Sequence, residues 1–307
     1  MKSGFVGAFA FQMRGNILTT KSDLGVLLPG GKTGILLLHD ICGSAAELRA
    51  HANAFARSGY TVSCPQLIGL GDSNVPGRGS AGMLVSEAEQ ALARLKSRCD
   101  HVTVVGMAYG AMLALELARH NSGAVQAVVL VEPRAWLPAL PFALPVAWSG
   151  KIKQTWLAGI LALGKGLLAK SVAPAALRAL PATGSIGFGS GAMAGTRAEL
   201  RTMASLLDSV HSGLPSIRQP VMLMHRHGAA RTGRDGSFLL QRRLGGRVES
   251  VMLEEPLSTF AGYDDRGAEV IADRGTRFIV TVLDEIETRR GNELRRQKVA
   301  AGRTNAA

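Results

Sequence analysis

The clearest chemistry in this sequence lies in residues 102–118, which read VTVVGMAYGAMLALELA. A run rich in β-branched residues leads into the pentapeptide GMAYG at 106–110, and helix-forming residues follow it. A strand, a turn with glycines two places before and after its centre, and a helix make the nucleophile elbow G-x-S-x-G, in which a serine attacks a carbonyl carbon. Ala108 stands where the serine belongs, and a methyl group has no lone pair for that attack. The segment therefore predicts the turn of a serine hydrolase without its nucleophile.

Short apolar segments alternate with helical ones on both sides of this turn. The run GILLLH at 34–39 is apolar up to its last residue, as in a strand that is buried on both faces. Such alternation with short connections implies right-handed crossovers and a mostly parallel sheet. We predict an α/β fold with strands over 34–39, 60–63, 102–105, 125–131, 220–225 and 247–253, helices over 45–58, 82–98, 110–120 and 268–289, and one or two edge strands within 4–28.

A segment without acidic residues interrupts this alternation. Residues 133–198 contain no Asp or Glu, but seven Lys or Arg, and they are rich in Leu, Ala, Pro and Trp. Three interpretations fit them: the roof of an apolar pocket with a cationic rim, helices that simply pack over the sheet, or a helix at a membrane surface. We predict a core of residues 1–132 and 215–288, a helical cap inserted at 133–214, and a basic tail at 289–307 that frays and becomes disordered.

The composition favours anionic partners and a reducing compartment. The formal net charge of the 307 residues is +12, which attracts phosphate groups, acidic proteins or anionic lipid unless it serves only solubility. The three cysteines are odd in number and form no C-x-x-C pair, so they indicate neither a disulfide framework nor a zinc site. No apolar stretch reaches 18 residues. We therefore expect a cytoplasmic protein, with peripheral contact to a membrane as an alternative.

Residues 34–73 carry a family resemblance. They read GILLLHDICGSAAELRAHANAFARSGYTVSCPQLIGLGDS. This is similar to the opening of microbial α/β-hydrolase carboxylesterases and monoacylglycerol lipases of the serine aminopeptidase S33-like type. These show a buried strand, an H-G-x-x-G-S loop, a helix, an A-x-x-G-Y-x-V strand and a P-x-x-x-G-x-G loop. The resemblance extends over most of the chain and implies an α/β-hydrolase fold with an inserted helical cap.

The resemblance also assigns the oxyanion hole, which holds the negative oxygen formed during hydrolysis. One donor comes from the loop at 39–43, and the second is the backbone N–H of Tyr109. The family has a glycine after the loop histidine, whereas this chain has Asp40. A carboxylate at this place opposes the charge that develops in the hole. The Tyr109 N–H survives, because a backbone donor needs no particular side chain.

The other two members of the catalytic triad are also substituted. The family's acid lies in a pattern like H-G-x-x-D, and HGA at 227–229 puts Ala229 at that position. Its histidine follows a strand ending in L-E, and LEEPLS at 253–258 puts Ser258 there. Losing one triad member slows hydrolysis on the order of 10⁴–10⁶-fold. With Ala108, the loss of all three indicates a protein that does not use a Ser-His-Asp triad.

Several residues at predicted strand ends and in the cap remain candidates for binding a ligand. A histidine could act as a general base, Cys42 as a nucleophile, or Tyr109 as a hydrogen-bond donor, although a packed side chain is the more common role of such residues. We expect no metal, because the spacing of His225 and His227 lacks further ligands, and no cofactor. The proposed ligand-binding residues are His39, Asp40, Ile41, Cys42, Ala108, Tyr109, Trp156, His225 and His227.

Three classes of function follow. The first is a non-hydrolytic protein that binds an acyl or hydrophobic ligand, such as acyl-CoA, an acyl-carrier protein or a lipid, beneath the basic cap. The second is an active enzyme of the same fold, an esterase, thioesterase, lyase, condensing or acyl-transfer enzyme, that uses other residues and backbone donors. The third is a structural docking partner. Few aromatic residues and no nucleic-acid module argue against a nucleic-acid partner.

Overall fold

The computed structural model describes residues 25–40, 43–67, 80–135, 186–188, 193–195, 197–226, 231–253 and 265–304. The predicted edge-strand region before residue 25 and the predicted cap between 136 and 185 lie outside these described residues. A short antiparallel pair, β6 (Ile186–Phe188) and β7 (Met193–Gly195), is described within the range expected for the cap.

The central sheet has seven strands, and all but one of them run parallel. Only β1 is antiparallel to its neighbour, β3, among the strands of this sheet. The strand order is β1 (Val26–Leu28), β3 (Thr61–Cys64), β2 (Thr33–Leu38), β4 (His101–Met107), β5 (Ala127–Val131), β8 (Val221–Arg226) and β9 (Val248–Leu253). The predicted mostly parallel sheet with flanking helices is thereby confirmed. Its central strands are mostly apolar, and both of their faces are covered.

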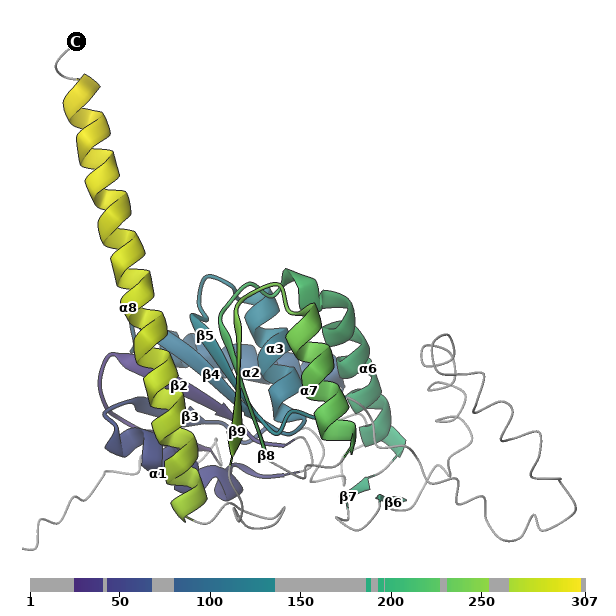
Figure 1. The fold of residues 1–307 in the computed structure, drawn as a ribbon. Coiled ribbons are helices and arrows are strands. Elements are labelled where there is room, and N and C mark those ends of the chain that lie inside the picture. The colour runs from purple at the N-terminus through teal and green to yellow at the C-terminus, as the bar shows by residue number, and fades with distance from the viewer. Residues whose placement is uncertain are drawn as a thin grey trace, which may run out of the picture.

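Helices cover both faces of this sheet (Figure 1). One face lies beneath α2 (Ala81–Lys96), α3 (Gly110–His120), α6 (Arg197–Gly213) and α7 (Arg231–Arg243). The other lies beneath α1 (Arg49–Arg57) and the first part of α8 (Asp265–Thr304), with the 3₁₀ turn η1 (Ala45–Leu48) before α1. A second 3₁₀ turn, η4 (Leu214–Ser216), connects α6 to β8. Alternate residues of each central strand therefore enter two separate apolar cores.

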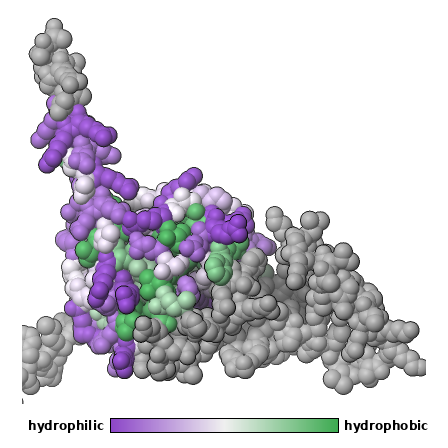
Figure 2. Space-filling view, in the orientation of Figure 1, coloured by the Kyte–Doolittle hydropathy of each residue, from purple (hydrophilic) through white to green (hydrophobic). Residues whose placement is uncertain are grey.

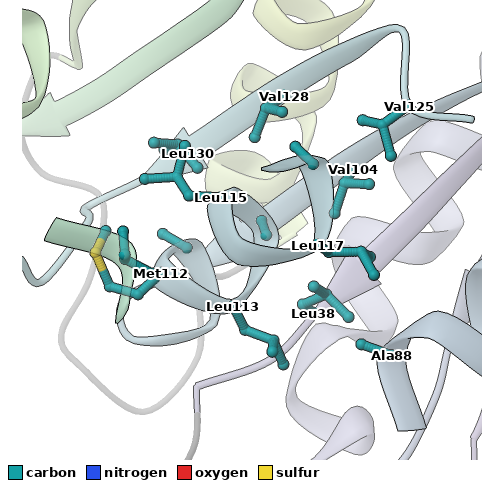
Figure 3. Close-up of a cluster of buried hydrophobic side chains, with 14 of the residues drawn as sticks. Leu38, Ala88, Val104, Met112, Leu113, Leu115, Leu117, Val125, Val128 and Leu130 are labelled. Carbon is teal, nitrogen blue, oxygen red and sulfur yellow. The ribbon is translucent and has the colours of Figure 1, made fainter. Parts of the chain in front are cut away.

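Helix α3 is the most deeply buried helix of the described chain, and it follows the GMAYG turn directly. Every residue from 110 to 118 is buried. Its side chains pack against the sheet, α2 and α6, and Figure 3 shows Met112, Leu113, Leu115 and Leu117 among the buried side chains of this core. Burying one such aliphatic side chain contributes about 1.5–3 kcal/mol. This packing fixes the start of α3, and with it the turn, relative to the sheet.

Residues 197–213, which we expected in the cap, form α6 and pack against α3 instead. Met203, Leu206 and Val210 are buried in the same core as α3. The reason is visible in the sequence, because these apolar residues recur every three or four positions and give the helix one apolar stripe. This segment therefore belongs to the layer that covers the sheet.

Helix α8 is also longer than expected. We expected the last helix to end near Arg289, but it continues to Thr304. Its first part buries residues such as Ile271 and Ile279 against α1 and the sheet, whereas the later part extends beyond the body and is hydrophilic (Figures 1 and 2). Residues 289–304 contain no proline and are rich in Arg, which together with Ala, Leu, Lys and Gln favours helix. Within the described residues, no helix combines the length and apolar character that crossing a membrane requires.

A buried carboxylate joins α3 to α6. Glu116 is 3% exposed, and its Oε1 accepts hydrogen bonds from Ser209 Oγ at 2.6 Å and from Arg119 Nη2 at 2.7 Å, while Oε2 accepts from Arg119 Nε at 3.0 Å. Burial by itself raises the pKa of Glu116, but the donors Arg119 and Ser209 outweigh it and hold the pKa below its ordinary value. The ionised carboxylate therefore stabilises the contact between the two helices.

We expect Glu116→Gln to lower the free energy of unfolding by about 2 kcal/mol near neutral pH, because the amide keeps the shape but loses charge-assisted acceptors. The folded-state pKa is below its ordinary 4.5, so this contribution is complete above that pH and disappears as the pH falls through the folded pKa. Urea unfolding followed by circular dichroism at neutral and acid pH measures the difference. Glu269→Gln, at an exposed ion pair with Arg57, is the control and should cost less than about 1 kcal/mol. A loss for Glu116→Gln that stays constant down to acid pH would contradict this account.

Candidate functional site

The turn at 106–110 has the backbone of a nucleophile elbow. Ala108 adopts a φ of +50°, in the left-handed region that alanine rarely occupies. A Cβ on Gly106 would lie 2.5 Å from the Cα of Ala111, and one on Gly110 would lie 2.3 Å from the carbonyl oxygen of His39. Both glycines are therefore required by close backbone contacts. The predicted elbow geometry is present, with a methyl group at its centre.

Backbone hydrogen bonds from the end of β5 hold this strained turn. The Ala108 N–H donates to the Val131 carbonyl at 3.0 Å, and the Arg134 N–H donates to the Ala108 carbonyl at 3.2 Å. Glu132, between them, also has a positive φ, of +48°, and its N–H donates to the Met224 carbonyl at 2.7 Å. A non-glycine residue in such a conformation costs on the order of 1–3 kcal/mol. The surrounding chain thus supports two strained residues side by side at the carboxyl edge of the sheet.

His39 follows β2 and is almost completely buried, at 1% exposure. Its Nε2 accepts a hydrogen bond from the Leu67 N–H at 3.1 Å, so the proton of the neutral ring is on Nδ1, which donates to the Asp40 carbonyl at 2.6 Å. Burial lowers the pKa of His39, and the opposing effects of Asp40 and Glu47 are smaller. With both ring nitrogens bonded to backbone, His39 ties the loop after β2 to the loop after β3.

Asp40 lies closer to the elbow than the sequence indicated. One of its carboxylate oxygens, Oδ1, accepts a hydrogen bond from the backbone N–H of Tyr109 at 3.3 Å. The resemblance assigns this same N–H to the oxyanion hole. The sequence predicted only that Asp40 would repel a negative oxygen nearby. In the structure, the Asp40 carboxylate already accepts the hydrogen bond of that N–H.

The ring of Tyr109 faces the core rather than a surface. The residue is 1% exposed and lies in the same core as α3. The guanidinium carbon of Arg134 lies 5.8 Å from the ring centroid, in the range of a cation–π contact. Tyr109 therefore contributes both its backbone N–H and a packed aromatic anchor to the turn. Hydrogen bonding of its hydroxyl to a ligand stays a prediction.

Other predicted site residues are placed only in part. His225 is half-buried on β8 and pairs in register with Met252 of β9 near the carboxyl edge of the sheet, the edge that also carries the elbow. Among the described cysteines, burial raises the pKa of Cys64 to about 12, and Cys99 is also buried with a raised pKa, so both thiols are inert. In the described ranges, no three His, Cys, Asp or Glu side chains gather as metal ligands would. Outside the described residues lie Ile41, Cys42, Trp156, His227, Ala229 and Ser258.

Comparisons with known proteins agree with this geometry. A family model described as "alpha/beta hydrolase fold" matches residues 34–168. The thermostable monoacylglycerol lipase of Bacillus sp. (strain H-257) is 32% identical over 111 residues, which are 36% of this chain and 44% of the lipase. The match therefore spans less than half of that relative.

Solved structures resemble the chain over a greater length. A structure from a study of LipS and LipT, two metagenome-derived lipolytic enzymes, has a TM-score of 0.58 at 18% identity and covers 84% of this chain and 97% of its own. The monoacylglycerol lipase of Paleococcus ferrophilus has a TM-score of 0.53 at 12% identity, and the match covers 82% of this chain and 97% of the lipase. Est1E from Butyrivibrio proteoclasticus has a TM-score of 0.56 at 11% identity, with 85% and 94% covered. The elbow, the strand order and these similarities lead to one conclusion: the chain has the α/β-hydrolase fold.

Proposed function

We propose that this protein is a non-hydrolytic relative of lipases and esterases that binds an acyl or otherwise hydrophobic ligand at the carboxyl edge of its sheet. One observation carries the proposal: the elbow is kept in its strained form, with Ala108 at a φ of +50°, although its side chain has no nucleophilic atom. Strain of this kind persists where function requires it. The turn therefore shapes a binding site rather than a reaction.

The ligand class follows from the relatives and from the sequence. A partial homologue is a monoacylglycerol lipase, so we expect the ligand of this fold to contain an acyl chain. The segment at 133–198 is apolar and basic, and as a cap it suits a ligand with an apolar chain and an anionic group. Acyl-CoA, an acyl-carrier protein and a lipid meet this description. Native mass spectrometry of the purified chain tests for such a retained ligand.

An active enzyme is the second candidate. The similarity in shape to lipolytic enzymes favours it, and so does the strained backbone of the elbow, which is kept although the Tyr109 N–H donates to Asp40 Oδ1. Such an enzyme would act on ester, thioester or acyl substrates with residues other than a Ser-His-Asp triad. Labelling or turnover distinguishes the two candidates.

We expect neither labelling by a fluorophosphonate probe nor turnover of p-nitrophenyl acyl esters above background. Ala108→Ser should also stay inactive, because the sequence places Ala229 and Ser258 where the acid and the histidine are needed. Ala124→Ser, away from the elbow, is the matched control, and an active monoacylglycerol lipase confirms the probe. Turnover by the unmodified chain would establish the second candidate. A gain on the order of 10⁴-fold for Ala108→Ser alone would show that a base and an acid are present elsewhere.

A further inference from the structure

We infer that the last part of α8, residues 289–304, binds membrane surfaces that contain anionic lipids. The inference goes beyond the proposed ligand site and does not depend on it. This part of α8 extends away from the body of the protein and is hydrophilic where its side chains are described (Figures 1 and 2). Every residue from 292 to 298 is exposed, so this stretch is open to a partner.

The packing of α8 onto the body ends before this segment. Its apolar side chains contact the core beneath α1 as far as Ile286, and among the described residues of α8 none after Ile286 belongs to that core. Glu285 forms an ion pair with Arg247, just before β9, and another with Arg289 at 3.9 Å. Most helical stability in proteins comes from packing of an apolar face. Beyond Arg289 the described part of α8 lacks this support, so we expect a partner to stabilise the helix.

The charge of this segment is not neutralised by its own chain. Four exposed cations follow Arg289, and within the described residues none of them forms an ion pair: Arg290, Arg295, Arg296 and Lys298. Glu293 is the only acidic residue after Glu287 in the sequence. Arg295 and Lys298, three positions apart on the helix, repel each other. An anionic partner would relieve this repulsion.

The net charge of the chain is concentrated rather than spread. Residues 289–307 contain six Arg or Lys and one Glu, and residues 133–198 contain seven Arg or Lys and no acidic residue. These two segments account for the whole formal net charge of +12, and the rest of the chain is neutral. Charge that served only solubility would need no such separation. Clusters of about four to eight Lys or Arg on a helix are typical of segments that bind anionic lipid.

Leu294 favours a lipid surface over other polyanions. It is 52% exposed, and Arg290 and Lys298 lie on the same side of the helix, one turn before and one turn after it. A helix at a membrane surface combines these elements, because its apolar side chains enter the boundary of the acyl layer while its cations reach the lipid phosphates. Duplex DNA or an acidic polypeptide offers negative charge, but no apolar layer for Leu294.

Sedimentation of the full chain with lipid vesicles tests the inference. We expect it to bind vesicles of phosphatidylcholine mixed with phosphatidylglycerol, but not phosphatidylcholine alone, and to bind less as salt screens the charges. Arg295→Gln combined with Arg296→Gln should weaken this binding on the order of tenfold, since each cation near an anionic surface adds affinity. The matched control, Arg242→Gln combined with Arg243→Gln, removes the same charge from an adjacent exposed pair in α7. It should change the affinity less than about twofold, because these charges lie outside the proposed contact.

Leu294→Gln distinguishes a lipid surface from another polyanion. It keeps every charge, and we expect it to weaken binding to the mixed vesicles about fivefold, because an apolar side chain no longer enters the acyl boundary. Glutamine favours helix in all of these variants, and circular dichroism establishes whether each is folded. Titrations with duplex DNA and with polyglutamate test the other two kinds of partner.

Several results would overturn the inference. Absence of binding to both kinds of vesicle would do so, whether or not DNA or polyglutamate binds. Equal losses in the two arginine double variants would show that net charge alone attracts the vesicles. Unchanged binding by the variant of Arg295 and Arg296 would place the contact elsewhere, as in residues 133–198. None of these results bears on the ligand of the proposed function, which native mass spectrometry tests separately.

Discussion

Gly110→Ala is expected to lower the free energy of unfolding by about 3 kcal/mol or more, which corresponds to a fall in Tm of roughly 5–10 °C. The added Cβ would lie 2.3 Å from the carbonyl oxygen of His39 and 2.5 Å from that of Leu38. Both atoms belong to the backbone at the end of β2, so no side chain can move aside. Relief requires a shift of α3, and α3 is buried on all sides between the sheet and its neighbouring helices.

Urea unfolding monitored by circular dichroism measures this loss, and Gly123→Ala is its matched control. A Cβ on Gly123, in the turn after α3, would meet no heavy atom within 4 Å, and its φ is not in the left-handed region. We expect that variant to change the free energy of unfolding by less than about 0.5 kcal/mol. Similar losses in the two variants would mean that backbone freedom, and not the contact with β2, explains the effect.

The same contact explains why the elbow could be predicted from the sequence. Backbone atoms lie too close to both glycines for a side chain, at the start of α3 for Gly106 and at the end of β2 for Gly110, so their spacing survives in the sequence even though the serine is absent. The sheet could be predicted for a similar reason, because a strand covered on both faces must be apolar along its whole length. The fold and the turn could therefore be predicted from the residue types in short segments of the sequence.

The extent of the helices after the elbow was harder to predict. We predicted that the cap extends to residue 214, beyond the segment without acidic residues, whereas α6 packs on the sheet layer through a stripe of apolar side chains and through Ser209, whose hydroxyl reaches Glu116 across 93 positions. A contact at that separation has no local signature. The continuation of α8 did have a local signal in the sequence, the helix-forming residues after Arg289, but the density of charge there suggested disorder.

The hydrogen bond of Asp40 shows that contacts between residues far apart in the sequence were also hard to predict at the site. The sequence revealed an unexpected charge beside a predicted oxyanion hole. It did not reveal that this charge would accept a hydrogen bond from a backbone N–H 69 positions away. One signal was available, because a helix that begins at the elbow offers free N–H groups to any nearby anion. Combining that rule with the substitution of the family's glycine by aspartate predicts the contact.

Buried histidines lower the stability of the fold at acid pH. His51, in α1, is 1% exposed, and that helix packs against α8. Burial lowers its pKa from 6.5 to about 4, so the folded protein keeps the ring neutral when the unfolded chain has already taken up a proton. Burial also lowers the pKa of His39 and of His211. Each of these groups binds more protons in the unfolded state, and stability therefore falls as the pH decreases.

We expect His51 alone to reduce the free energy of unfolding by about 3 kcal/mol between pH 6.5 and pH 4, since one pKa unit corresponds to about 1.4 kcal/mol. The contribution is complete above pH 6.5, is lost progressively as the pH falls, and changes no further below about pH 4, where both states are protonated. His51→Gln removes the titration, so its stability should fall less steeply over this window in urea unfolding series. His39 and His211 remain in that variant and preserve part of the slope. If His51→Gln and the unmodified chain lose stability in parallel from pH 6.5 to pH 4, protonation of His51 is not what destabilises the fold at acid pH.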